Sequence, residues 1–179
     1  MDIDSLNGEQ LKSLAKRSLE EAFCGPPLDV TEAEKKELAL TNGVFVTLKV
    51  DNELHGCIGR LDHSAPLWRK IPELAKAAAF EDNRFMPLTK EEMPSLSVEI
   101  TILGDPVPVK SLDEIAIGRD GLIVEKGYCR GLLLPQVAQE YGWDVETFLR
   151  HTCLKAGLPP DAWGKGGVKL YKFEGVVFC

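Results

Sequence analysis

The order hairpin, helix, strand occurs twice along the 179-residue chain, and this repetition limits the fold more than any other feature. In the first copy, apolar-rich segments meet at a turn within 43–59, an amphipathic stretch covers 66–80, and residues 96–103 alternate as a strand does. The second copy has a hairpin over 121–134, helical segments over 136–156 and a strand over 168–178. We therefore predict an internally duplicated α+β fold, in which a mixed or antiparallel sheet packs against helices.

The two copies are expected to form one domain together with a helix that precedes them. Apolar residues recur three or four positions apart from residue 5 onward, and Gly25, Pro26 and Pro27 end the pattern. We predict an N-terminal helix over 5–24 and pseudo-repeats over about 43–104 and 120–178. Within the hairpins, the segment LHGCI (54–58) aligns with CRGLL (129–133).

The register of the first hairpin decides which residues lie beside Cys57. A two-residue turn at 51–52 would pair Leu48 with His55 and mix polar with apolar side chains on each face. A three-residue loop at 51–53 pairs Val46 with Ile58 and gives one apolar face. Because a slip of one residue moves every side chain to the other face, we predict the three-residue loop. Five residues then share the second face: Thr47, Lys49, His55, Cys57 and Gly59.

Composition excludes several classes of protein. With 44% apolar residues and a net charge of −7, the chain is expected to fold. It has no apolar run as long as a membrane span, and its first residues do not resemble a secretory signal. We therefore expect a soluble, cytoplasmic protein. The chain carries no basic stripe of the kind that nucleic-acid backbones require, although five acidic and six basic residues over 128–179 leave room for a small anion site.

The cysteines and histidines indicate no metal chemistry. The five cysteines form no CxxC pair, and the three histidines form neither an HxH nor an HExxH motif. We predict no resident metal and no cofactor. In a reducing compartment, most of these thiols are expected to be small core residues.

Cys57 stands apart because glycines flank it within a predicted strand. Gly56 and Gly59 each weaken that strand by about 0.5–1 kcal/mol, and a bulge or the close approach of a backbone or ligand is the usual reason for such a glycine. Cys57 is thus a candidate nucleophile. His55, roughly 6.5–7 Å away along the strand, is a candidate to tune it. Alternatively, Cys57 is a small packing residue beneath a second layer.

Four segments together resemble the AMMECR family: LHGCIG (54–59), FEDNRFMPLTKEE (80–92), RGLLLPQV (130–137) and HTCLKAGLPPDAW (151–163). The resemblance extends over residues 5–178 and is greatest to archaeal members. It implies an α+β fold with two similar halves. Prokaryotic members are called AmmeMemoRadiSam system protein A, and this name implies Memo-like and radical SAM proteins as partners. The chain lacks the CxxxCxxC motif and the histidine set of those partners, so it is neither of them.

The family signature reads Leu-Arg-Gly-Cys-Ile-Gly, and His55 replaces its arginine in this chain. A permanent cation is therefore exchanged for a group that titrates near pH 6.5. Arg130, at the corresponding place in the second copy, or Arg60 could supply the missing charge for a small anionic ligand.

Three further residues are candidates for ligand binding. Asp82 and Arg84 could contact a ligand, or they could form only a local ion pair. Gln136 follows Pro135 at the start of a helix, where its amide could meet a ligand or cap the helix.

These features leave three functional hypotheses. The first is a binding or accessory module that acts with Memo-like and radical SAM proteins, and we place it slightly ahead because no second catalytic group stands at a compelling spacing from Cys57. The second is a thiol-dependent enzyme that uses Cys57 in a cleft. The third and weakest is nucleic-acid binding, which salt-dependent retention would reveal.

Overall fold

The computed structural model describes residues 3–179 and confirms the α+β fold. The chain divides into two compact units. The first ends at Leu103 and also includes Val176–Cys179, and the second comprises Gly104–Gly175. No helix in residues 3–179 is long and apolar enough to cross a membrane.

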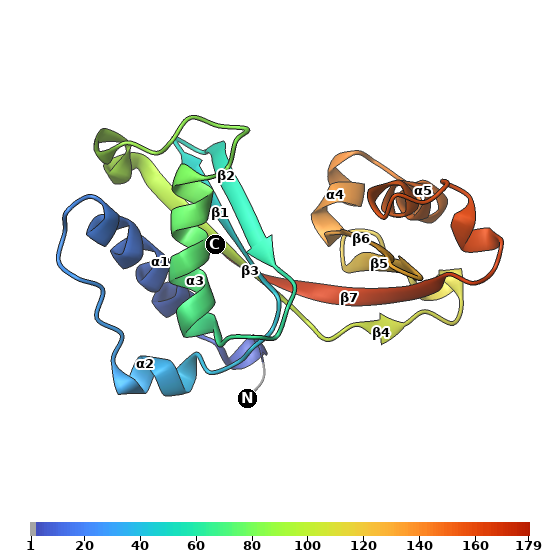
Figure 1. The fold of residues 1–179 in the computed structure, drawn as a ribbon, viewed down its shortest axis with the longest axis horizontal. Helices are drawn as coiled ribbons and strands as arrows, with labels where there is room; N and C mark the ends of the chain where they lie inside the picture. Colours follow the sequence, from blue (N-terminus) through green and yellow to red (C-terminus); the bar gives the residue numbers. More distant parts are fainter. Residues whose placement is uncertain (1–2) are drawn as a thin grey trace. The chain divides into compact units, whose positions relative to one another are not determined.

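The first unit is an antiparallel sheet in the order β2–β1–β3, with helices on one face (Figure 1). Val44, Val46 and Leu48 of β1 point to that face and are fully buried with residues of α1, α3 and β3. The elements of this unit are η1 (Ile3–Ser5), α1 (Gly8–Ala22), α2 (Glu32–Glu37), β1 (Val44–Val50), β2 (Glu53–Arg60), α3 (Leu67–Phe80), η2 (Lys90–Ser95) and β3 (Leu96–Leu103).

Local sequence signals explain where these helices begin. The Asn7 side chain accepts hydrogen bonds from the backbone N–H groups of Glu9 and Gln10 at the start of α1. Thr31 and Glu34 form a reciprocal capping box on α2. α3 runs as one helix through Pro72 and does not restart there.

The observed hairpin register combines the two alternatives that the sequence offers. Asp51 and Asn52 both have positive φ values, 51° and 67°, and form a two-residue turn between Val50 and Glu53. The predicted three-residue loop is therefore wrong. A β-bulge then leaves His55 without a partner on β1, because Lys49 pairs with Leu54 and Leu48 with Gly56. The extra residue restores the expected pairing of Thr47 with Cys57.

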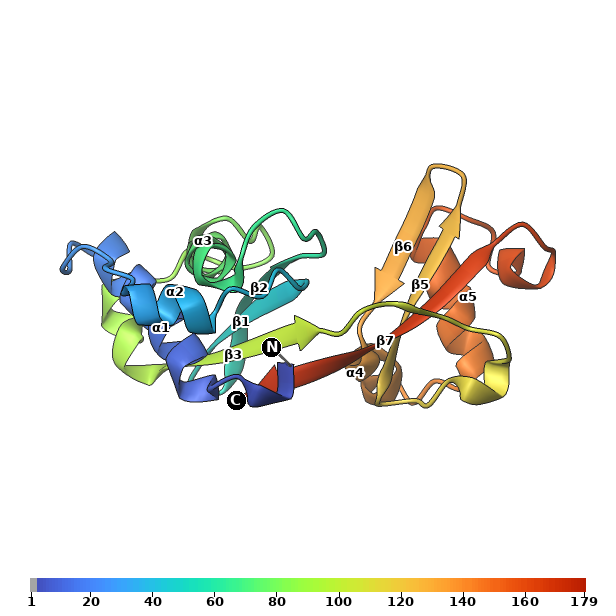
Figure 2. The same ribbon diagram turned by 90° about the horizontal axis from the view of Figure 1, so that it is seen from below.

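The second unit repeats the order hairpin, helix, strand. Its sheet is antiparallel, with β5 between β6 and β7 and β4 paired to β7, and α5 packs against β5 and β6 (Figure 2). Asp144 caps α5 and Gly157 adopts a positive φ just after it, as predicted. The elements are β4 (Val107–Pro108), η3 (Leu112–Glu114), β5 (Asp120–Lys126), β6 (Cys129–Leu133), α4 (Pro135–Glu140), α5 (Val145–Lys155), η4 (Ala162–Gly164) and β7 (Lys169–Phe178), of which residues 176–178 belong to the first unit.

Gly56 and Gly131 are glycines for the same physical reason. A Cβ atom on Gly56 would lie 2.1 Å from the carbonyl oxygen of Ala78 in α3. A Cβ atom on Gly131 would lie 2.3 Å from the backbone nitrogen of Ala156, just after α5. In each hairpin, therefore, only a glycine lets the helix backbone lie directly on the strand.

A buried lysine fixes the ends of the first hairpin. The Lys70 side chain is fully buried, and its Nζ donates to the carbonyl oxygens of Thr41, Asn42 and Asp62 at 2.9, 2.5 and 2.9 Å. Burial lowers the pKa of Lys70. The three carbonyl oxygens satisfy the ammonium group and tie α3 to the segments on both sides of the hairpin.

Candidate functional site

The site predicted around Cys57 lies on β2, at the edge of the first unit's sheet. The backbone N–H of Cys57 donates to Asp82 Oδ2 at 2.9 Å. Its carbonyl oxygen accepts a hydrogen bond from Arg84 Nη2 at 3.2 Å. Asp82 and Arg84 follow the end of α3, so a short side-chain pair takes the place of a neighbouring strand at Cys57.

Asp82 and Arg84 form a close ion pair. Arg84 Nε donates to Asp82 Oδ1 at 2.9 Å, and Arg84 Nη2 donates to Oδ2 at 2.7 Å. The Asp82 side chain is only 5% exposed, whereas that of Arg84 is 60% exposed. The Arg84 guanidinium holds the pKa of Asp82 well below its usual range, and the Cys57 N–H adds to this effect. Asp82 is consequently a carboxylate at any physiological pH.

The Cys57 thiol is half-buried and has a hydroxyl as its partner. Thr47 Oγ1 donates to Cys57 Sγ at 3.1 Å across the β1–β2 pair. Hydrogen bonds to Asp82 raise the pKa of Arg84, whose guanidinium also donates to the Cys57 carbonyl oxygen.

His55, at the bulge, lies beside Phe85. Its ring stacks on Phe85 with a centroid separation of 6.5 Å, and the Arg84 guanidinium also lies over the Phe85 ring, 5.3 Å from its centroid. His55 Nε2 is buried, and no residue in the described part of the chain is its hydrogen-bond partner.

Four residues at this site are candidates from the sequence: His55, Cys57, Asp82 and Arg84. Hydrogen bonds bring Cys57, Asp82 and Arg84 together. Phe85 is the residue that sequence reasoning missed: it lies in the FEDNRFMPLTKEE segment that carries the family resemblance, but no spacing rule relates it to His55. We call the group His55, Cys57, Asp82, Arg84 and Phe85 the Cys57 cluster.

The other predicted cations are engaged elsewhere. Arg60 pairs with Asp62 at 2.9 Å and with Glu73 at 3.4 Å, so its charge is balanced locally. Arg130 belongs to the second unit, where its Nε lies 3.0 Å from Glu125 Oε1 on the facing strand.

The two remaining candidates, Gly59 and Gln136, have different surroundings. A Cβ atom on Gly59 would lie 2.2 Å from the Phe45 ring, so this glycine makes room for a side chain of the facing strand. Gln136 lies in α4 of the second unit and forms no side-chain cap there. Its Oε1 is buried without a hydrogen-bond partner among the residues that the structure describes.

The remaining cysteines differ from the expectation of small core residues. Only Cys153 is fully buried, and burial raises its pKa. Cys24 and Cys179 are exposed, and Cys129 is half-buried. Within residues 3–179, no group of three or more His, Cys, Asp and Glu side chains is placed to hold a metal ion.

Fold and site together define a class of α+β protein with two units. In each unit the backbone at a helix contacts a glycine of the hairpin. In the first unit an Asp–Arg pair holds a half-buried cysteine at the edge of the sheet. The family model described as AMMECR1 matches residues 12–178. The chain therefore belongs to the AMMECR1 family, as the four segments predicted.

Archaeal proteins of known sequence or structure are similar to this chain. Protein MJ0810 of Methanocaldococcus jannaschii is 54% identical over 144 residues, which cover 76% of this chain and 72% of that protein. Protein NEQ441 of Nanoarchaeum equitans is 41% identical over 175 residues, covering 94% and 97%. The crystal structure of an uncharacterized protein, PH0010 from Pyrococcus horikoshii, matches with a TM-score of 0.83 at 43% identity, covering 95% of this chain and 89% of that one.

Proposed function

We propose that this protein is a non-catalytic binding module and that the Cys57 cluster is its contact surface. The observation that supports this most is the hydrogen bonding of the cluster. Asp82 is committed to Arg84 and to the Cys57 backbone, and among residues 3–179 the thiol has only the Thr47 hydroxyl as its partner. A nucleophilic cysteine needs a base or a dedicated cation within hydrogen-bond reach, and the lowered pKa of Asp82 makes this carboxylate a poor base.

The exposed residues next to the cluster support a macromolecular partner. Met86 is 80% exposed and follows Phe85 directly, and Leu54 is 46% exposed beside the bulge. Methionine and arginine are enriched at protein interfaces, and Arg84 adds a partly exposed cation that could also hold a small anion. Exposed apolar side chains together with one cation fit a partner with an apolar surface and an acidic group.

More specifically, we propose that the protein is an AmmeMemoRadiSam system protein A that works in the cytoplasm with Memo-like and radical SAM proteins. The four family segments support this assignment, since two of them contain Cys57, Asp82 and Arg84.

Co-expression of the chain with a Memo-like and a radical SAM protein from one archaeon, followed by size-exclusion chromatography, tests the module. We expect co-elution, and we expect Met86→Asp to abolish it because the substitution puts a charge in place of an exposed apolar side chain next to Phe85. Tyr128→Asp, at the exposed turn between β5 and β6, is the matched control and should leave co-elution unchanged. Separate elution of all components would contradict the proposal.

A thiol-dependent enzyme is the alternative, and the position of Cys57 near Arg84 favours it. The rate of iodoacetamide alkylation at Cys57 between pH 5 and 9 distinguishes the two functions, with Cys129 of the same molecule as the reference. A rate that is already maximal below pH 7 would favour the enzyme. A rate that rises through about pH 8.5, as for ordinary thiols, supports the module.

A further inference from the structure

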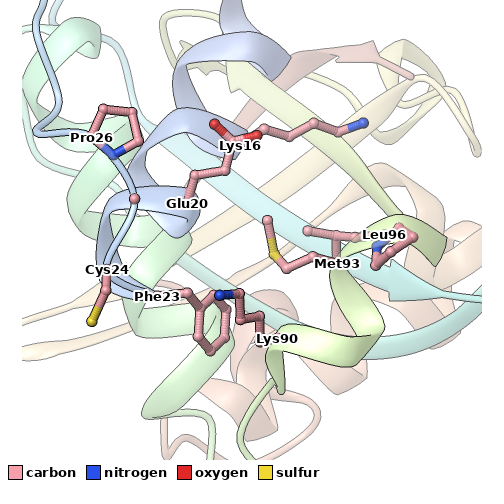
Figure 3. Close-up of a pocket in the computed structure, with 10 residues that line it drawn as sticks. Lys16, Glu20, Phe23, Cys24, Pro26, Lys90, Met93 and Leu96 are labelled. Carbon is pink, nitrogen blue, oxygen red and sulfur yellow. The ribbon is translucent and has the colours of Figure 1, made fainter.

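A cavity of about 560 Å³ lies in the first unit between the second half of α1, the segment after it, η2 and the start of β3 (Figure 3). None of its lining residues belongs to the Cys57 cluster. Its volume falls within the range of small-molecule sites, roughly 300–1,000 Å³.

The cavity has an apolar wall. Phe23, Met93 and Leu96 line it, and Leu96 is 5% exposed and belongs to the main core of the unit. The Phe23 ring is held edge-on against Phe80 at a centroid distance of 5.6 Å. This wall offers a fixed apolar surface to a ligand, because its members are anchored in the core behind them.

Two lysines without ion pairs flank the apolar wall. Figure 3 shows the Lys16 and Lys90 side chains on different sides of the Met93 side chain. Among residues 3–179, neither lysine has a carboxylate within ion-pair distance, whereas nearby Lys12 pairs with Glu9 at 2.6 Å. Glu20 is the single acidic residue among the described residues of the lining, so these residues carry a net positive charge.

A second cavity, of about 340 Å³, adjoins the first along α1 and shares Lys16 and Glu20 with it. Charged and polar side chains dominate its described lining, which includes Lys12, Arg17 and Ser97. Lys16 thus lines both this polar cavity and the cavity with the apolar wall, so a ligand with an anionic group near Lys16 can place an apolar chain toward Phe23.

We propose that this cavity binds a small amphipathic carboxylate, with its apolar chain on Phe23, Met93 and Leu96 and its carboxylate at Lys16 or Lys90. Two properties of the ligand follow from the lining. Each methylene that the cavity covers completely should tighten binding by about fourfold. The negative charge should contribute a further several-fold, because two ammonium groups lie beside the apolar wall.

Isothermal titration calorimetry with octanoate, butanoate and octanol tests the proposal on the full chain. We expect octanoate to bind at least about tenfold more tightly than butanoate and more tightly than octanol. Lys16→Gln combined with Lys90→Gln should weaken octanoate binding by about tenfold and leave octanol binding unchanged. Lys36→Gln combined with Lys155→Gln removes two exposed lysines outside the cavity and should change neither affinity.

Cysteine alkylation reports where the ligand binds. Cys24 lines the cavity and Cys129 lies in the second unit, so saturating octanoate should slow iodoacetamide alkylation of Cys24 and leave that of Cys129 unchanged. Met93→Glu should remove both the binding and the protection of Cys24. Equal affinity for octanoate and octanol, or unprotected Cys24 at saturation, would overturn the proposal. The co-elution of the chain with its proposed protein partners does not depend on the outcome of these ligand-binding experiments.

Discussion

Replacing Asp82 with asparagine tests whether the Asp82–Arg84 pair holds the edge of the sheet. The substitution keeps the size of the side chain but removes the charge that accepts hydrogen bonds from the Cys57 N–H and from two nitrogens of Arg84. Hydrogen bonds to a charged group are worth about 1.5–3 kcal/mol each, and the 60% exposure of Arg84 lets water replace part of the loss. We expect the free energy of unfolding to fall by about 2–3 kcal/mol at pH 7.

The pH dependence of this loss identifies its cause. Because the pKa of Asp82 is lower in the folded than in the unfolded protein, its stabilising contribution is present above the unfolded pKa. It disappears as the pH falls through the folded pKa. The difference between wild type and Asp82→Asn should therefore be largest near neutral pH and shrink below about pH 4.

Urea denaturation at a series of pH values, followed by circular dichroism, measures this difference. Glu73→Gln is the control, since it removes a 53% exposed partner of Arg60 at 3.4 Å and should cost less than about 0.5 kcal/mol. A loss for Asp82→Asn as small as that of the control, or the same loss at pH 3 and pH 7, would refute the role assigned to Asp82.

Three further substitutions have expected effects on stability that the same denaturation assay measures. Gly56→Ala should lower the free energy of unfolding by about 3 kcal/mol or more, since its Cβ would lie 2.1 Å from a helix carbonyl; Gly164→Ala, with open space around it, should change it little. Lys70→Met should cost about 2–4 kcal/mol, because it leaves three carbonyl oxygens without their donor, and a loss below 1 kcal/mol would contradict this role. Cys24→Gly should stabilise the protein by roughly 0.5–1 kcal/mol, since Cys24 has a φ of 64° after α1, whereas Cys24→Ala, which keeps a Cβ, should not.

Much of the fold follows from periodicity and end signals. The alternation over 96–103 predicts β3 with its observed bounds, and Asp144 and Gly157 mark the ends of α5 correctly. The helix over 66–80 differs from α3 by one residue at its start. These features depend on residues that are close together in the sequence, so they can be predicted from it.

The hairpin shows where local reasoning fails. Side-chain alternation favours a register that places Thr47 beside Cys57, and that pairing is correct. Alternation cannot show that a two-residue turn and a bulge at His55 reach the same register as a longer loop. The bulge leaves a single residue, His55, unpaired, and this changes no hydrophobic pattern in the sequence.

The hydrogen bonds of the site depend on tertiary structure. Asp82 lies 25 positions from Cys57 in the sequence, and only the packing of α3 on β2 brings its carboxylate to the strand edge. A local Asp82–Arg84 ion pair could be predicted from spacing, but its bonds to the Cys57 backbone could not. The exposure of Cys24 and Cys179 could not be predicted from the sequence either, because composition alone suggests buried thiols.

The alkylation rate of Cys57 in the presence of partners tests the binding surface most directly. Iodoacetamide labelling, resolved by mass spectrometry, compares the free protein with the complex that it forms with Memo-like and radical SAM proteins. We predict that the complex slows alkylation of Cys57 and leaves that of Cys129 unchanged. A complex in which Cys57 reacts as fast as in the free protein would contradict the assignment of the Cys57 cluster as the contact surface.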